Sequence, residues 1–563
     1  MVRVTIMMSF IFCNLFIYSQ TVEWVESAGG SGNDMSHSII VDNAGYIYST
    51  GFFSDTVDFD PSAGQEILIS NGNYDIFLQK LDQNGNLIWV KGMGGDFTDY
   101  GNSLAFDSQG NLYLAGSFQQ TVDFDPNAGV HNLTSTSLKS AFVQKLDTAG
   151  NFIWVKHIDG IGQGSRAASI EIDGFDNIYT TGEFYGTLDF DPNGGTNFLT
   201  TANPSHSDAY IQKLDTSGNL IWAKSMIGPR PNYGFSIAVD QSGNVYSTGV
   251  FEDTIDLDPN PGVANFISEG NSDMYIQKLD SSGNLDWAKV VGHHYTVKGY
   301  AIDVDQNSNV LITGSFFDTV DFNPGVDVDL LYGDMMSIFA LKLDSSGEYV
   351  WAKNMCSKNV YTNGHNIVSD NSGNVVVVGQ FIDTVDFDPN GGVHELICDG
   401  GYDAFIQKLD ENGNLLWAER YGGFGHDIIR GVAFGPSGNI FLAGTFQSQV
   451  DVQTVSGNNQ IIANGWNDVF VMKIAGTSSI YEQEIETLKI YPNPTTGLFN
   501  VELPSGLEAG HLSIFNLQGQ QISSISLQGE KNIELSIIDL PSGLYYLQVE
   551  NDHYREIFRI IKQ

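Results

Sequence analysis

The chain has 563 residues, of which 62 are glycine, and a formal net charge of −42 from 25 basic and 67 acidic side chains. A surface this acidic repels phosphate backbones and anionic membranes, which excludes nucleic acid as a partner. The glycine content, the many aromatic residues and the scarcity of long helical patterns predict an all-β chain of short strands and tight turns.

The start of the chain, residues 1–20, is predicted as a secretory signal peptide. Arg3 supplies a positive charge, an apolar run follows it, and the cleavage site is expected near Ser19 or Gln20. No other stretch is long and apolar enough to cross a bilayer. We therefore expect an exported chain with no membrane span.

Seven tryptophans recur at intervals of 64 to 68 residues and mark an internal repeat. Six of them end a phrase such as 77–89, and each unit also holds an earlier pair of short strands such as 236–251. Both strand pairs surround turns mostly of the Asp-x-x-Gly-Asn type, in which Asp bonds nearby backbone and Gly or Asn accepts positive φ. The seven are Trp24, Trp89, Trp154, Trp222, Trp287, Trp351 and Trp417.

Two hairpins per unit give four antiparallel strands, A to D, which is the composition of a propeller blade. Residues 21–475 are therefore predicted to form a seven-bladed β-propeller of about 65-residue repeats. Trp24 lacks the first half of its phrase, and Asp468–Ile474 lacks the second half. We expect these halves to pair, so that an N-terminal strand closes the last blade and leaves no free sheet edge. The tryptophans are expected to pack between blades.

Between strands B and C, each unit carries an insert that opens with Thr-Val-Asp-Phe-Asp-Pro or a variant of it, and an apolar stretch should complete an extra hairpin. Alternation places both carboxylates on one side of a strand, where they could bind Ca²⁺, a cation that takes several oxygen ligands. Asn323 and Gln453 replace the second carboxylate in two copies, so a role as turn and edge residues is the alternative. The candidate ligands are Asp58, Asp60, Asp123, Asp125, Asp189, Asp191, Asp256, Asp258, Asp386 and Asp388.

Strand order places the B-to-C and D-to-A connections at one end of the ring, and these connections vary in sequence. Variable loops on a rigid scaffold usually carry recognition, so any ligand site is expected on this face. Cys356 and Cys398 fall on the same face, and an exported chain meets oxidising conditions. A disulfide between them is one prediction, and two separate buried thiols are the alternative.

Composition changes after Lys473: residues 476–487 are predicted as a linker, and residues 488–563 as a small Ig-like β-sandwich. Three ordered motifs, near 488–499, 512–519 and 540–549, resemble the C-terminal sorting domain of the type IX secretion system of Bacteroidetes. The resemblance implies that this machinery is a partner and that the chain is secreted or anchored at the outer-membrane surface. The motif residues are Tyr491, Pro492, Asn493, Pro494, Gly497, Gly543 and Tyr545.

The repeats themselves look like bacterial β-propeller repeats that are often joined to such sorting domains, a resemblance that implies a fold and no settled activity. No local catalytic or phosphate-binding motif occurs. The leading hypothesis is a monomeric, non-catalytic binding or adhesion propeller for a glycan or another surface protein. The alternative is a polysaccharide hydrolase or lyase in which acidic residues of the insert act as general acid and base.

Overall fold

The computed structural model describes residues 20–476 and 489–563, apart from 61, 63, 358–360, 504–508, 518–519, 529–531 and 551–554. The chain divides into two compact units, Met1–Thr477 and Ser478–Gln563. The predicted signal peptide and linker lie outside the described residues, except for Gln20 and Gly476. Across the described ranges, no helix has the length and apolar character needed to cross a membrane.

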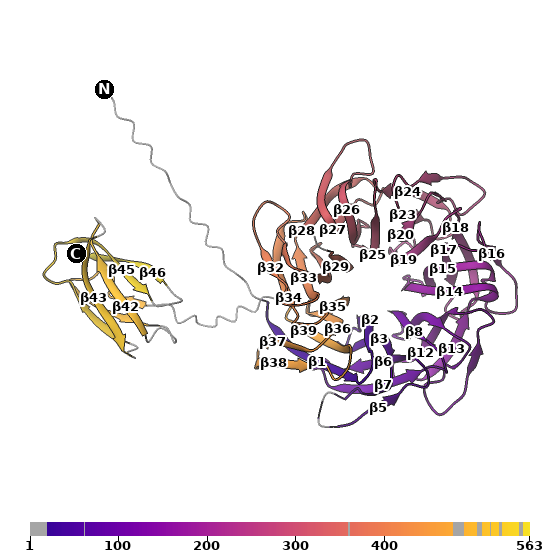
Figure 1. Cartoon of the computed structure of the whole chain (residues 1–563), viewed down its shortest axis with the longest axis horizontal. Coiled ribbons are helices and arrows are strands. Elements are labelled where there is room, and N and C mark those ends of the chain that lie inside the picture. The colour runs from indigo at the N-terminus through magenta and orange to yellow at the C-terminus, as the bar shows by residue number, and fades with distance from the viewer. Residues whose placement is uncertain are drawn as a thin grey trace. The chain divides into compact units, whose positions relative to one another are not determined.

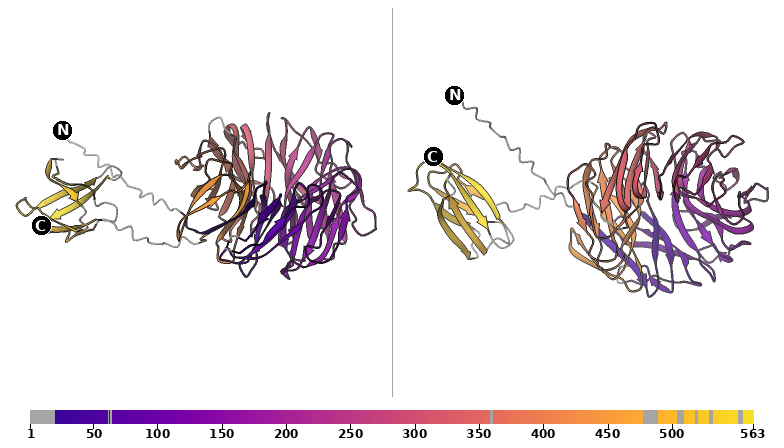
Figure 2. Two further views of the ribbon diagram at one scale, coloured as in Figure 1. Left: turned by 60° about the horizontal axis from the view of Figure 1, so that its bottom comes forward. Right: turned by 45° about the horizontal axis from the view of Figure 1, so that its top comes forward.

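Within residues 20–476, the first unit contains nine sheets: seven include a path of four antiparallel strands, and two are separate two-stranded hairpins. Figures 1 and 2 show the seven sheets arranged around a common axis, with one strand of each nearest the axis. These inner A strands are β2 (Met35–Val41), β8 (Tyr100–Phe106), β14 (Asp159–Ile172), β19 (Asn232–Val239), β25 (Val297–Val304), β29 (Asn363–Ser369) and β35 (Ile428–Phe434).

The next two strands of each sheet are almost wholly buried, except where β15, β26 and β27 extend into the inserts, because neighbouring sheets cover both of their faces. The B strands are β3 (Ile47–Phe53), β9 (Leu112–Phe118), β15 (Ile178–Asp189), β20 (Val245–Phe251), β26 (Val310–Asp321), β30 (Val375–Phe381) and β36 (Ile440–Phe446). The C strands are β6 (Asp75–Leu81), β12 (Ser140–Leu146), β17 (Ser207–Leu214), β23 (Asp273–Leu279), β27 (Leu330–Leu343), β33 (Asp403–Leu409) and β39 (Asp468–Ile474).

The outer D strands carry the tryptophans, and the first of them in the chain belongs to the last sheet. They are β7 (Leu87–Met93), β13 (Phe152–His157), β18 (Leu220–Met226), β24 (Leu285–Val291), β28 (Tyr349–Ser357), β34 (Leu415–Tyr421) and β1 (Val22–Gly30). Strand β1 pairs antiparallel with β39, with Val22 opposite Ile474 and Trp24 opposite Lys473. The two ends of the repeat region thus meet in one sheet, as the incomplete first and last phrases predict.

The turn chemistry follows the predicted pattern. In the turn after β6, the Oδ1 atom of Asp82 accepts hydrogen bonds from the backbone N–H of Asn84 at 2.8 Å and of Asn86 at 3.0 Å. The side-chain amide of Asn86 donates to Asp82 Oδ2 at 2.9 Å, and Gly85 has a φ of 87°. A residue with a side chain is strained at this φ, so glycine fixes the tight turn.

Every insert forms the predicted hairpin, either from separate short strands or by extension of strands B and C. In two of the inserts, a strand also pairs with the end of the preceding blade's D strand: Asp58 pairs with Gly29, and Asp386 pairs with Cys356. The separate insert strands are β4 (Thr56–Asp58), β5 (Ile67–Ile69), β10 (Thr121–Asp123), β11 (Asn132–Thr134), β16 (Phe198–Thr200), β21 (Thr254–Asp256), β22 (Asn265–Ile267), β31 (Thr384–Asp386), β32 (Glu395–Ile397), β37 (Gln449–Thr454) and β38 (Gly457–Ile462).

The second unit is a small β domain of two sheets, ordered β40-β41-β44 and β43-β42-β45-β46 in its described part. Buried residues of both sheets, including Val501 and Leu547, form one core. Its strands are β40 (Lys489–Tyr491), β41 (Leu498–Glu502), β42 (Ala509–Phe515), β43 (Gln521–Gln528), β44 (Asn532–Ser536), β45 (Gly543–Glu550) and β46 (Arg555–Lys562).

Candidate functional site

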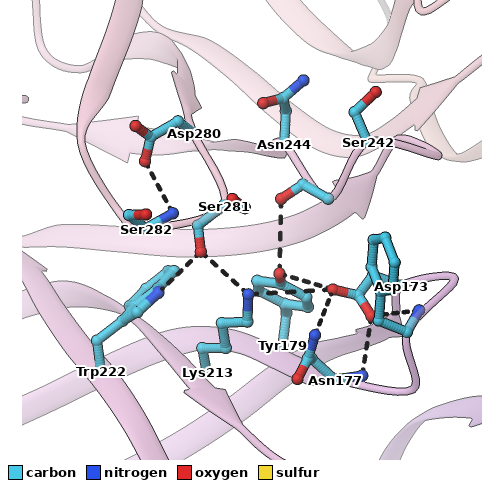
Figure 3. Close-up of polar contacts among 12 residues, drawn as sticks. Asp173, Asn177, Tyr179, Lys213, Trp222, Ser242, Asn244, Asp280, Ser281 and Ser282 are labelled. Atoms are coloured by element: carbon cyan, nitrogen blue, oxygen red, sulfur yellow. Dashed lines mark hydrogen bonds and ion pairs between the residues drawn. The ribbon is translucent and has the colours of Figure 1, made fainter.

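The repeated tryptophans join neighbouring blades. Figure 3 shows one such joint, where the indole Nε1 of Trp222 donates to the carbonyl oxygen of Ser281 at 3.2 Å. Lys213 Nζ donates to the same oxygen at 3.0 Å, and Tyr179 donates to Asp173 beside it at 3.0 Å. Trp24 and Lys473 repeat this arrangement on the carbonyl of Gln83, at 3.1 and 3.2 Å. The joint closed by β1 therefore uses the same contacts as an internal joint, and these tryptophans have the predicted structural role.

The carboxylates proposed as calcium ligands hold the insert loops in shape. Asp58 Oδ1 accepts the backbone N–H of Asp60 at 3.1 Å and of Glu66 at 3.0 Å. Asp60 Oδ1 in turn accepts the N–H of Ser62 at 2.8 Å. The same bonds recur at Asp123 and Asp125, Asp189 and Asp191, Asp256 and Asp258, and Asp386 and Asp388.

These bonds match the turn-and-edge alternative, and Val57 and Phe59, on the other side of the same segment, are fully buried. Among the residues that the structure describes, no group of three or more His, Cys, Asp or Glu side chains is placed to hold a metal ion. Calcium binding by these carboxylates remains a prediction.

Cys356 lies near the end of β28 and Cys398 directly follows β32, and these two strands of one sheet are separated by β31. Cys398 is a half-buried free thiol, and burial raises its pKa. The side chain of Cys356 lies outside the described residues. A disulfide between them remains a prediction.

A β-bulge in each of the seven A strands brings a variable set of side chains to the axis of the ring. In every A strand, a register shift leaves one residue near the axis without a partner in strand B, and such a bulge re-aims its side chain. Strand β14 has a second irregularity, between Ile161 and Gly164. All seven bulge residues line one cavity of about 380 Å³, here called the axial cavity. They are His37, Asn102, Ala168, Phe235, Tyr300, His365 and Arg430.

The axial cavity has an aromatic side and a polar side. Phe235 and Tyr300 lie with ring centroids 5.6 Å apart, and the ring of His365 lies 6.0 Å from that of Tyr300. Continuing around the axis, Arg430, His37 and Asn102 form the polar side. Between these bulge residues the wall consists mainly of small side chains, including Ser38, Ser103, Ser169, Ser236 and Ala301.

Arg430 is the unpaired charge of the axial cavity. Its Nε atom is buried without a hydrogen-bond partner, and no carboxylate among the described residues lies within 4.0 Å of its guanidinium. Burial lowers its pKa. Arg166, in the same cavity, differs because its Nη1 lies 3.6 Å from Glu183 Oε2.

Both histidines of the cavity are neutral at pH 7. Burial lowers the pKa of His37 to about 3, and the nearby charge of Arg430 acts in the same direction. The pKa of His365 is lowered to about 3 for the same two reasons. Since a carbonyl oxygen only accepts, His37 Nδ1 donates to Gly101 O at 3.0 Å. At neutral pH the side chains of the polar side therefore carry one net positive charge, that of Arg430.

A second cavity of about 520 Å³ adjoins the first along the axis, toward the ends of the A strands, and shares Ser38 and Ser103 with it. This part is acidic. Burial raises the pKa of Glu171 to about 8, and the charge of Asp303 adds to the rise. Asp303 Oδ2 accepts two hydrogen bonds from Ser369, both at 2.8 Å.

The axial cavity lies toward the starts of the A strands, at the ring end where the sequence predicts recognition, but sequence reasoning named none of its residues. A signal was present: each bulge residue stands 13 or 14 positions after a repeated tryptophan. The residue type there changes in almost every copy, whereas most flanking residues are small.

The residues of the sorting motifs meet in the second unit. The Asn493 side chain donates to Arg559 O at 2.7 Å and accepts from the N–H of Ile561 at 2.9 Å. Lys562 Nζ donates to the carbonyl oxygens of Ile538, at 2.6 Å, and Leu540. Tyr545 donates to Pro541 O at 2.7 Å, and a Cβ at Gly497 would lie 2.7 Å from Ile538 Cα. The bonds of Asn493 and Lys562 fix the terminal strand β46 to the rest of the domain.

Family comparisons agree with both units. Residues 88–117 match the model of the beta-propeller repeat, and residues 489–563 match the secretion system C-terminal sorting domain. The four-stranded sheets and the repeat match define a β-propeller repeat protein. The chain is, more specifically, a β-propeller repeat protein with a type IX C-terminal sorting domain, which implies secretion or attachment to the cell surface.

Two curated relatives are similar over part of their length. The uncharacterized WD repeat-containing protein L264 of Acanthamoeba polyphaga mimivirus is 23% identical over 541 residues, which covers 80% of this chain and 38% of that protein. The regulatory protein FlaEY of Caulobacter vibrioides is 28% identical over 185 residues, or 31% of this chain and 19% of that protein. The chain thus spans less than half of either relative.

Among solved structures, Sqt1 from Chaetomium thermophilum aligns with 82% of this chain and 100% of its own, at 9% identity and a TM-score of 0.35.

Proposed function

We propose that the protein is a secreted or surface-displayed seven-bladed propeller, closed by its N-terminal strand, that binds a glycan or another surface protein without catalysis. The observation that carries the proposal is the ring of seven bulge residues on one cavity. Pockets that bind small ligands usually measure about 300–1,000 Å³ and combine apolar walls with a few polar groups. The axial cavity, at about 380 Å³, has both properties.

The rigid frame also supports a binding role. The insert carboxylates, which the catalytic alternative would use as acid and base, already accept backbone hydrogen bonds within their own loops. The seven bulge positions, in contrast, differ in chemistry from blade to blade while the surrounding strands stay alike. A constant scaffold with a varied set of inward side chains is the arrangement expected of a recognition site.

The test is a panel of oligosaccharides and polysaccharides screened against the chain from Gln20 to Gln563. Retention without change of the glycan supports binding. Release of shorter products would replace this proposal by the hydrolase or lyase hypothesis. If no glycan is retained, the same chain should next be screened against surface proteins, and failure there would refute the proposal. Repeating the panel with and without Ca²⁺ shows whether the insert carboxylates contribute.

A further inference from the structure

We propose that the axial cavity binds an anionic sugar, that is, a glycan residue bearing a carboxylate or a sulfate group. This inference rests on the binding function proposed above and names the class of its ligand. The first argument is the state of Arg430. A guanidinium presents several N–H donors in a plane that suits two-point binding of a carboxylate or a similar oxyanion. Although the chain has a net charge of −42, the guanidinium of Arg430 faces the axial cavity and has no ion-pair partner among the described residues.

The side chains near Arg430 contribute to an anion site, and they do not compete with an anionic ligand for its guanidinium. His37 and His365 lie near enough for the charge of Arg430 to act on both rings. The Nδ1 proton of His37 is donated to Gly101 O, so its Nε2 can only accept, for example from a sugar hydroxyl. The Nε2 atom of His365 is buried with no hydrogen-bond partner in the described structure. The acidic side chains Glu171 and Asp303 line the second cavity and not the axial cavity.

The second argument is the aromatic side of the cavity, which favours a sugar ring over a free inorganic anion. The rings of Phe235 and Tyr300 lie 5.6 Å apart and give an apolar surface about two rings long. Aromatic side chains combine apolar area with a rigid shape, and tyrosine adds a hydroxyl that can bond a ligand. A pyranose has an apolar face and polar edges, so a ring packed on this side can direct its anionic substituent toward Arg430.

The experiment measures affinity for oligosaccharides of equal length whose sugars are neutral, carboxylated or sulfated. We expect the anionic sets to bind more tightly than the neutral set, and the carboxylated and sulfated arms identify the group. Arg430→Gln should weaken anionic binding by about 10- to 100-fold, because a hydrogen bond to a charged group is lost. Arg430→Lys keeps the charge without the planar donors and should lose less. Arg166→Gln should lose less than Arg430→Gln, because Arg166 is already paired with Glu183.

Further variants test whether binding takes place in the axial cavity or at the connecting loops. Tyr300→Ala should weaken neutral and anionic sugars together, whereas Tyr300→Phe should retain binding. Trp466, which is 80% exposed in a connecting loop, is the control, and Trp466→Ala should bind as the parent does. Equal binding of neutral and anionic sets would overturn the anionic assignment and leave the binding function standing. Loss of binding in Trp466→Ala but not in Arg430→Gln would overturn the placement in the cavity. If no glycan is bound at all, the anionic-sugar proposal fails, and the proposed binding function then depends on the screen against surface proteins.

Discussion

Replacing Asp34 by Asn is expected to remove much of the pH dependence of the joint between the last blade and the first. Asp34, before β2, and Asp468, at the start of β39, are both fully buried. Asp34 accepts backbone N–H bonds from Gly30 and Ser54, both at 3.0 Å, whereas Asp468 Oδ1 has no hydrogen-bond partner in the described structure. Burial raises the pKa of Asp34 to about 7, and the charges of Asp468 and Asp55 add to the rise.

The magnitude follows from the shift in pKa. The unfolded chain loses this proton near the ordinary value of 3.8, whereas the folded protein keeps it to about 7. Stability therefore falls as pH rises between these values, by about 1.4 kcal/mol per unit and about 4 kcal/mol in all, and the loss is complete above the folded pKa. Asn is neutral throughout and has no such loss.

Asn also lacks one oxygen acceptor, and leaving a backbone N–H unbonded costs about 1–3 kcal/mol at every pH. Relative to the parent, the variant should gain about 3 kcal/mol between pH 5 and pH 8 and be the more stable protein at pH 8. The assay is thermal unfolding followed by tryptophan fluorescence across this range. Parallel pH profiles for the parent and Asp34→Asn would refute the reasoning.

Another joint supplies a matched control. Asn232 stands ten residues after Trp222, as Asp34 does after Trp24, and its side-chain amide donates to Asp208 Oδ1 at 2.7 Å. This bond shows that the fold can bring the two positions into hydrogen-bonding distance. Asn232→Asp should therefore create a carboxyl pair and destabilise the protein most at pH 8. A pH-independent effect of Asn232→Asp would contradict the same argument.

Three further predictions concern other parts of the chain. Deleting residues 21–30 should speed hydrogen exchange in β39 far more than in the equivalent strand β33, and equal exchange in both would refute closure by β1. Calcium at 1 mM should leave the melting temperature unchanged, because a site with a Kd of about 10 μM would add about 2.7 kcal/mol of stability, which a melt would detect. Lys562→Met should lower the melting temperature of the sorting domain and reduce export. A blot that compares secreted with cell-retained protein measures the export. Normal export of a destabilised variant would show that the stability of the domain and its role in export are separate.

Much of the fold of the repeats was predictable because each repeat contains the residues that determine its own turns. Asp-x-x-Gly turns define hairpins locally, so strands A to D follow without long-range information. Pairing of β1 with β39 was predictable for another reason: the phrase that Trp24 completes is the one that stops at Ile474. Alternation in the insert also put Val57 and Phe59 on the side opposite the carboxylates, and both are fully buried.

The axial cavity was harder to predict because it depends on bulges. Strict alternation assigns each residue of a strand to one face, and a single extra residue reverses that assignment. Sequence reasoning also placed recognition in the loops, where variation is conspicuous, and overlooked variation confined to one position per A strand. The insert carboxylates left two interpretations open for a different reason, since an Asp that binds a cation and an Asp that caps a turn have the same spacing.

The closing joint also has a mechanical consequence. In the pair of β1 and β39, Val22 lies opposite Ile474, and the N–H of Ala475 donates to Thr21 O at 3.0 Å. Both ends of the propeller chain therefore leave the ring at the same end of one antiparallel pair. A force applied between these two ends loads the hydrogen bonds of the β1–β39 pair one after another and does not shear them all at once. Tension should thus open the ring at this joint while the other six blades keep their strands.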